Sequence, residues 1–201
     1  MGSKQDEIIP TTSVTLVLIF IAPPETELEE KRIWVGNTDS KLSKAGYESA
    51  VDFARHDMWL KPTRIYCPPA SHILEFVSIL LPFSTPTIVE EFTDRSMGSL
   101  TGRDYRETMA EFPRRNWLGW QRSFWIAPPN GESLFDISDR VITAFRVKIL
   151  PVSSSETVLI VCAPDVMRIL LGFLTHTEEP EVPKLTIEPV IPYVVNGHIE
   201  R

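Results

Sequence analysis

A continuous apolar run at 14–21 is the feature of this sequence that most constrains the fold. Its eight residues read VTLVLIFI, which is the composition of a strand buried on both faces of a parallel sheet. The run ends abruptly at Ala22-Pro23-Pro24. Because ligands of open α/β sheets bind beyond the carboxyl ends of such strands, a site is expected where these prolines lie.

Strand-like and helix-like segments alternate along the rest of the chain. Runs of β-branched and apolar residues predict strands, and apolar residues spaced three and four apart predict helices. Strands are expected at 64–67, 87–92, 157–162 and 190–195, and helices at 43–55, 71–81, 103–112, 133–149 and 166–174. This alternation predicts an α/β domain of three layers, with a mostly parallel central sheet and helices on both faces.

The length of the chain predicts a single domain. With 201 residues the chain can bury a full hydrophobic core. We expect one domain over 1–201, with its core at about 14–195 and flexible tails at 1–12 and 196–201. Pro192 predicts an edge position for the last strand, because proline cannot donate a hydrogen bond to a neighbouring strand.

Composition excludes several classes of function. The hydrophobic fraction of 43% is ordinary for a folded domain, and no apolar run is long enough to cross a bilayer. A net charge of −7 disfavours binding to nucleic acid. Two cysteines and the lack of a secretory signal in the first ten residues indicate a reducing compartment, and we expect a cytoplasmic protein.

Cysteine and histidine residues offer few candidate sites. Cys162 and Arg168 have the Cys-x5-Arg spacing of cysteine-dependent phosphatases. However, no glycine lies between them to form a phosphate cradle, and Asp165 would oppose an anion at the start of the following helix. A buried structural thiol is therefore the favoured interpretation. No pair of histidines has metal-ligand spacing, so no metal is expected.

Four segments, taken in order, are similar to segments of one family. They are WVGNTDSKLSKAGYESA from Trp34, FTDRSMGSLTGRDYRETMAEFP from Phe92, WQRSFWIAPPNGESL from Trp120 and VLIVCAPDVMRILL from Val158. The chain resembles the histidine phosphatase superfamily over about 14–195, and within it most closely the cofactor-dependent phosphoglycerate mutases. The resemblance implies a mutase-like three-layer fold. It also implies phosphoryl transfer through a histidine nucleophile, with arginines holding the phosphate.

The same resemblance places unusual residues at the implied catalytic positions. The family's Arg-His-Gly motif falls on Ala22, Pro23 and the next proline, and its second histidine falls on Ala163. Its second arginine falls near His72, and Asp94 lies where a proton-donating glutamate belongs. Proline has neither a nucleophilic side chain nor an N–H group. The sequence therefore predicts a protein that is not an enzyme, a pseudoenzyme with no cofactor.

Basic and aromatic residues that match the family suggest what else this fold does. Four arginines are expected to attract an anion, namely Arg95, Arg103, Arg122 and Arg168. Three tryptophans either close a lid over the emptied pocket or form a partner surface, namely Trp117, Trp120 and Trp125.

Three functions are consistent with the sequence. The leading hypothesis is a protein-binding or scaffolding subunit, with homodimerisation expected from the resemblance alone. The alternatives are a non-catalytic sensor of an anionic phosphometabolite, and a residual phosphatase that uses Asp94 or Cys162 in a non-histidine mechanism.

Overall fold

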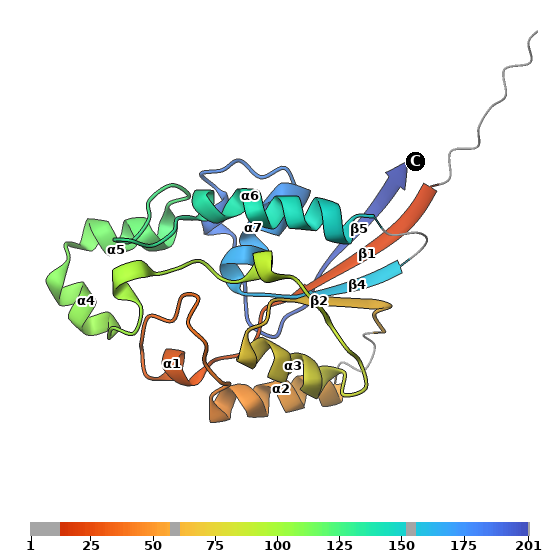
Figure 1. Cartoon of the computed structure of the whole chain (residues 1–201), viewed down its shortest axis with the longest axis horizontal. Coiled ribbons are helices and arrows are strands. Elements are labelled where there is room, and N and C mark those ends of the chain that lie inside the picture. The colour runs from red at the N-terminus through yellow and green to blue at the C-terminus, as the bar shows by residue number, and fades with distance from the viewer. Residues whose placement is uncertain (1–12, 57–60, 152–155, 201) are drawn as a thin grey trace, which may run out of the picture.

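A five-stranded sheet with the order β3-β2-β4-β1-β5 forms the centre of the protein (Figure 1). The computed structural model describes residues 13–56, 61–151 and 156–200. The strands are β1 (Ser13–Ile21), β2 (Arg64–Cys67), β3 (Thr87–Ile88), β4 (Glu156–Val161) and β5 (Tyr193–Glu200). All pairings are parallel except that of β1 with β5. The mostly parallel α/β sheet predicted from the sequence is thus confirmed.

The apolar run at the start of the chain lies in the middle of this sheet. β1 pairs with β4 from Leu16 opposite Glu156 to Ile21 opposite Val161, so both strands end at the same level. Side chains alternate between the two faces of a strand. Leu18 and Phe20 therefore pack into one core cluster, and Ile19 and Ile21 pack into the other. Both faces are covered, which explains why the run is continuously apolar.

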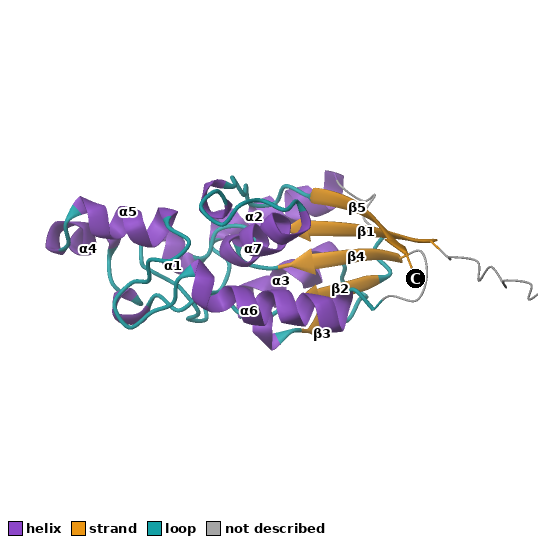
Figure 2. Cartoon of the chain, turned by 90° about the horizontal axis from the view of Figure 1, so that it is seen from above, coloured by secondary structure: helices purple, strands orange, loops and turns teal. Residues whose placement is uncertain are grey.

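Helices cover both faces of the sheet (Figures 1 and 2). One face packs against α6 (Leu134–Ala144) and α7 (Pro164–Leu174), and the other against α2 (Lys44–His56) and α3 (Ser71–Leu80). Ser133 starts α6 with a capping box, because its hydroxyl accepts from the amide of Asp136 and the Asp136 carboxylate accepts from the amide of Ser133.

A smaller region lies beyond the carboxyl ends of the parallel strands (Figure 2). It contains α1 (Glu27–Glu30), α4 (Tyr105–Glu111), α5 (Arg114–Arg122) and the 3₁₀ turn Gly98–Leu100. Two further 3₁₀ turns lie elsewhere, since Glu90–Phe92 packs against α6 in the main core and Val182–Lys184 follows α7. The core of the smaller region is a third cluster formed by Trp34, Met97, Leu100 and Trp120. Gly98 has φ +54°, and a Cβ atom there would lie 2.3 Å from the carbonyl oxygen of Pro129. Only glycine fits this turn.

Several element boundaries differ from those predicted. The strand expected at 87–92 keeps only Thr87–Ile88, at the exposed edge of the sheet, before a 3₁₀ turn begins. The helix expected at 133–149 ends at Ala144 and continues as the π-helical turn Phe145–Ile149. The loop after β1 contains α1, and the aromatic segment after 113 forms α5.

The last strand also differs from the prediction. β5 starts at Tyr193 and runs to Glu200 rather than ending at 195. It pairs with β1 along its whole length, from Phe20 opposite Tyr193 to Ser13 opposite Glu200. The tail expected from 196 is therefore strand as far as residue 200, because β1 offers an unpaired edge there. The expected edge position of this strand is confirmed, and the tail expected at 1–12 lies outside the described residues.

Candidate functional site

A cavity of about 530 Å³ lies at the carboxyl ends of the central parallel strands. Its lining includes Pro23 after β1, Ala163 after β4, and also His72 and Asp94. The structure thus brings together four of the five positions that the resemblance singled out. The fifth, Ala22, is fully buried just behind the cavity, where its carbonyl oxygen accepts a hydrogen bond from the amide of Val190 at 2.9 Å.

Three helices begin at the wall of this cavity. Their N-cap residues Thr26, Ala70 and Ala163 all line it. Each helix start carries a partial positive charge from its free amides. Carboxylates of the chain accept hydrogen bonds from backbone amides at the starts of α1 and α3. No side-chain hydrogen bond caps α7 at Ala163.

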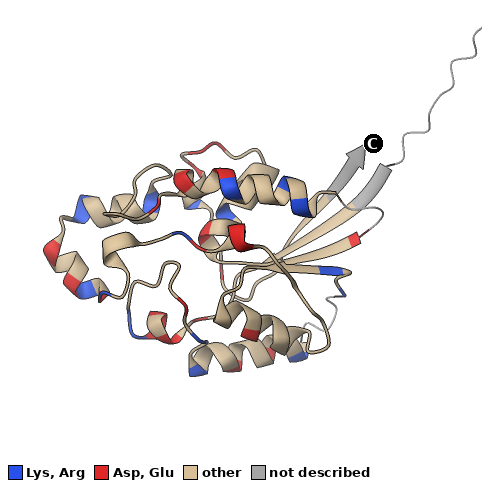
Figure 3. Cartoon of the chain, in the orientation of Figure 1, with Lys and Arg blue, Asp and Glu red and all other residues tan. Residues whose placement is uncertain are grey.

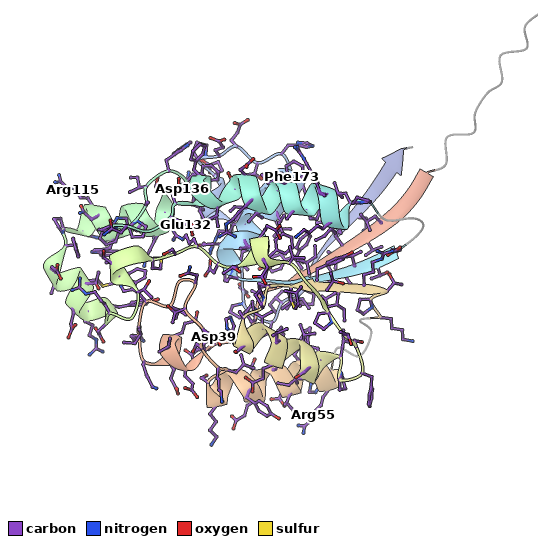
Figure 4. All side chains as sticks on the ribbon, in the orientation of Figure 1. Asp39, Arg55, Arg115, Glu132, Asp136 and Phe173 are labelled. Carbon is purple, nitrogen blue, oxygen red and sulfur yellow. The ribbon has the colours of Figure 1, made fainter. Side chains whose placement is uncertain are left out.

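The two capped starts show how carboxylates reach the cavity. Glu29 completes the capping box of α1, because its carboxylate accepts from the amide of Thr26 at 2.8 Å. Asp39 caps α3, because it accepts from the amide of Ser71 at 2.8 Å and also from the Ser71 hydroxyl. Figure 4 labels Asp39 beside the start of α3. These hydrogen bonds lower the pKa of Asp39.

Asp94 is the most perturbed carboxyl group of the cavity. Burial, with a further contribution from the charge of Asp165, raises the pKa of Asp94 to about 7. The amide of Arg95 donates to Asp94 Oδ1 at 2.8 Å, which opposes this shift without cancelling it. Asp94 therefore exchanges a proton near neutral pH, as a general acid or base must.

His72 is the histidine that lines the cavity. Burial lowers its pKa, although the charges of Glu29 and Asp39 oppose that shift. The imidazole is therefore neutral at pH 7. Its Nδ1 atom is buried and has no hydrogen-bond partner in the described part of the chain.

The four arginines expected to attract an anion do not converge on the cavity. Arg95 is 6% exposed and donates from Nε to Asp165 at 2.6 Å and from Nη2 to the Trp120 carbonyl at 2.8 Å. Arg168 donates to the other oxygen of Asp165 at 2.6 Å.

The other two arginines lie elsewhere. Arg103 pairs with Glu111, and Arg122 lies exposed at the end of α5. None of the described arginines or lysines is among the residues that line the cavity. The sequence reasoning missed that Asp165 neutralises both Arg95 and Arg168. The pair with Arg95 spans 70 residues and leaves no local pattern, whereas the pair with Arg168 has the i,i+3 spacing of a helix and could have been found.

Neither cysteine can act as a nucleophile in this structure. Cys162 is fully buried, and burial raises its pKa far above the ordinary value. Burial raises the pKa of Cys67 to about 11. Because the thiolate is the reactive form, the structure favours the structural interpretation of both residues.

The three tryptophans lie in different environments. Trp120 is 4% exposed in the third core cluster, and Trp117 packs partly buried against that cluster. Trp125 is 51% exposed and lies edge to face with Phe124 at 5.6 Å between ring centroids. They do not form one surface, and only Trp125 of the three is open to a partner.

Two carboxylates of the site had little signal in the sequence. Glu25 follows the two prolines and accepts from the Ser43 hydroxyl at 3.2 Å. Asp39 caps a helix that begins 32 residues later, so no capping motif near that helix could reveal it. Within the described residues, no group of three or more His, Cys, Asp and Glu side chains is arranged to hold a metal ion.

Comparison with known proteins identifies the family. Residues 19–196 match the histidine phosphatase superfamily (branch 1), and the chain belongs to this family. A 2,3-bisphosphoglycerate-dependent phosphoglycerate mutase from Chelativorans sp. (strain BNC1) is 29% identical over 187 residues, which cover 88% of this chain and 90% of that protein. The mutase of the same name from Chlamydia felis (strain Fe/C-56) is 31% identical over 140 residues, 68% of this chain and 57% of that protein.

Solved structures agree with this assignment at the level of the fold. Bacillus stearothermophilus YhfR superimposes with a TM-score of 0.78 at 21% identity, covering 89% of this chain and 90% of that one. A mycobacterial glucosyl-3-phosphoglycerate phosphatase superimposes with a TM-score of 0.76 at 17% identity, covering 94% and 97%.

These comparisons correct the functional expectation drawn from the sequence. The prediction that the chain is not an enzyme is contradicted, because its relatives by sequence are named as phosphoglycerate mutases. A scaffolding role has no support among them. Among the described helices, none has the length and apolar character needed to cross a membrane.

Proposed function

We propose that this protein is a slow phosphatase, which hydrolyses a phosphate ester in the cavity with Asp94 as its general acid. The observation that carries the proposal is the position and acidity of Asp94. Burial raises the pKa of Asp94 to about 7 at the wall of the cavity, so a large fraction of the protein holds the carboxylic acid at neutral pH. A proton donor with this pKa suits the departure of an alcohol from phosphorus.

Water is the nucleophile in this proposal. The side chains of Pro23 and Ala163 cannot attack phosphorus, and Cys162 is buried as a thiol. The oxygen of a water molecule forms the new bond to phosphorus while the bond from phosphorus to the ester oxygen breaks. The departing oxygen takes the proton of Asp94. The resulting carboxylate then takes a proton from the attacking water, which restores the acid and leaves phosphate and the free alcohol.

Two groups support the phosphoryl oxygens. The start of α7 at Ala163 has no side-chain cap, and its free amides favour negative charge. Asp165 lies in its first turn, but Arg95 and Arg168 balance the charge of that carboxylate. The neutral imidazole of His72 supplies one further hydrogen bond. The carboxylates of the cavity oppose 2,3-bisphosphoglycerate, which carries several negative charges, so no step here involves that cofactor. With no arginine or lysine among the described residues that line the cavity, we expect turnover below the ~1 s⁻¹ that bounds typical enzymes.

Hydrolysis by an Asp94→Asn variant tests the proposal. Phosphate release from p-nitrophenyl phosphate and from 2- and 3-phosphoglycerate is measured between pH 5 and pH 9. The wild type is expected to lose activity as pH rises through about 7, where Asp94 gives up its proton. The amide variant is expected to lose about 10²–10⁴-fold in kcat/KM below pH 7, and the difference is expected to narrow above pH 7, where the wild type itself loses the proton.

A matched variant distinguishes the loss of the Asp94 proton from a general effect of an Asp→Asn substitution on the fold. Asp139→Asn makes the same change on the exposed surface of α6 and is expected to keep full activity. Equal hydrolysis by Asp94→Asn and the wild type, or a rate that does not fall above pH 7, would refute the role of Asp94. No hydrolysis of any phosphate ester by the wild type would refute the proposed function itself.

A further inference from the structure

The charge of the cavity lining is the observation from which a substrate class follows. Four carboxyl groups line it, namely Glu25, Glu29, Asp39 and Asp94. The basic group among the lining residues is His72, which burial keeps neutral at pH 7. A cavity lined in this way repels anions and attracts cations.

Hydrogen bonds of the fold hold these carboxylates in place. Asp39 and Glu29 cap two helix starts, and Glu25 accepts from the buried hydroxyl of Ser43. The hydrogen bonds from Ser71 lower the pKa of Asp39 and keep it ionised at neutral pH. Figure 3 shows the acidic first turn of α1, to which Glu29 belongs, on the same side of the sheet as α3. Hydrogen bonds of the fold therefore fix the positions of the negative charges that line the cavity.

Proline and aliphatic side chains make up much of the remaining lining, beside the polar Thr26, Asn37, Thr38 and Thr93. Five of its side chains illustrate this, namely Pro23, Pro24, Pro68, Pro69 and Ile73. Proline rings and an aliphatic side chain favour contact with methyl and methylene groups. An inorganic cation would gain nothing from such walls. An organic cation, with charge and apolar surface in one group, fits both parts of the lining.

His72 supplies an independent indication that the cavity takes a polar ligand. Its Nδ1 atom is buried without a hydrogen-bond partner among the described residues. A buried polar atom left unpaired costs free energy, and a ligand removes that cost if the ring turns to present this atom to the cavity. The alcohol part of a substrate fits here, since a hydroxyl pairs with a neutral imidazole nitrogen in either tautomer and an ester oxygen accepts from that nitrogen when it carries the hydrogen.

We propose that the substrate of this cavity is a phosphate ester whose alcohol part carries an organic cation, such as a quaternary or protonated amine. The identity of the ester rests on the phosphatase function proposed above, whereas cation binding does not. The carboxylates of Glu29 and Asp39 attract the cation, and the prolines contact its alkyl groups. The same carboxylates disfavour phosphoglycerates, whose non-phosphate part is an anion.

A pair of ligands with the same shape and different charge tests cation binding. Choline and its neutral carbon analogue 3,3-dimethyl-1-butanol are titrated into the full chain by isothermal calorimetry, and their effect on melting temperature is measured. Choline is expected to bind at least about tenfold more tightly, because the carboxylates attract its charge and the neutral analogue has none. Added salt is expected to reduce the difference. Equal affinity for the two ligands would overturn the proposal.

Two neighbouring glutamates provide the matched variants. Glu29→Gln removes a carboxylate from the cavity, and Glu30→Gln makes the same change one residue further, outside the lining. Choline affinity is expected to fall about fivefold in the first variant and to stay unchanged in the second. Because Glu29 also caps α1, its variant is judged at a temperature where both remain folded. An equal loss in both variants would contradict a local role.

Turnover distinguishes the two proposals. Phosphocholine is expected to be hydrolysed at least about tenfold faster, in kcat/KM, than 3-phosphoglycerate. Choline binding with no hydrolysis of either ester would overturn the phosphatase function and leave the cation site standing. Faster hydrolysis of 3-phosphoglycerate would keep the phosphatase function and overturn the substrate class.

Discussion

Asp165 neutralises two arginines near the cavity by pairing with both of them. Its two oxygens accept from Arg95 and Arg168, each at 2.6 Å. The Arg95 side chain is 7% exposed and that of Asp165 is 19% exposed, so water compensates little of either charge. At the same time the charge of Asp165 helps to raise the pKa of Asp94. A single carboxylate thus neutralises the arginines near the cavity and keeps a proton on its neighbour.

The Asp165→Asn substitution tests this arrangement at the residue scale. It leaves the buried guanidinium of Arg95 without its anionic partner, and breaking such a pair costs about 3–5 kcal/mol. We expect a loss of about 3 kcal/mol or more in the free energy of unfolding, measured by urea denaturation at pH 8. Asp139→Asn, on the exposed surface of α6, should change stability by less than ~0.5 kcal/mol. Similar small changes in both variants would show that the pair contributes little.

The pairing of β5 with β1 is the feature that matters most at the scale of elements. β1 is a central strand only because β5 covers its outer edge from Ser13 to Phe20. Without β5 the long apolar strand β1 would become a sheet edge, and exposed apolar edges promote aggregation.

A truncation after Pro192 tests this role of β5. We expect a chain that lacks residues 193–201 to unfold at a lower temperature and to aggregate, as measured by size-exclusion chromatography and thermal denaturation. The control is Val194→Lys in the full chain. Val194 is 47% exposed on β5, so the substitution keeps every backbone pair and should leave the chain monodisperse. A truncated chain as soluble and stable as the control would contradict the covering role.

Elements with strong periodicity could be predicted from the sequence, and elements held by distant contacts could not. β1 and β4 are continuous apolar runs, so their place in the sheet was evident. β3 is only two exposed residues, and its pairing to β2 defines it rather than its own composition. α5 was missed because its aromatic residues pack on Trp34 and Leu100, contacts that no local pattern contains.

The candidate site, like the fold, has features that the sequence predicts and features that depend on distant contacts. The resemblance pointed to Pro23, His72, Asp94 and Ala163, and these four residues do line one cavity. They could be found because each lies just after a predicted strand or at the start of a predicted helix. The charge of that cavity was not predictable. It depends on Asp39, which acts on a distant helix, and on Asp165, which pairs with Arg95 across 70 residues.

At the scale of the whole molecule, the pH dependence of unfolding combines groups that act in opposite directions. Burial raises the pKa of Asp94 to about 7 from the 3.8 that is ordinary for an aspartate. The native state therefore binds more protons than the unfolded state between these values, so this group lowers stability as pH rises through that range. Burial lowers the pKa of His72 below 6.5, so that group raises stability as pH rises toward 6.5. Asp39 and Asp136, whose pKa values hydrogen bonds lower, lose their stabilising effect only in acid.

Asp94→Asn isolates the contribution of Asp94 from the others. The amide cannot ionise, so above pH 7 the variant avoids the cost of a buried carboxylate, whereas at pH 4 it replaces a carboxylic acid and gains nothing. We expect it to unfold at a higher temperature than the wild type at pH 8, by on the order of 1 kcal/mol or about 2–4 °C, and the difference to vanish toward pH 4. His72 and Asp39 are unchanged, so their contributions cancel in the comparison. A variant equally or less stable at pH 8 would mean that the Asp94 carboxylate is solvated or paired in the native state, and the proton that the proposed hydrolysis requires would not be held there at neutral pH.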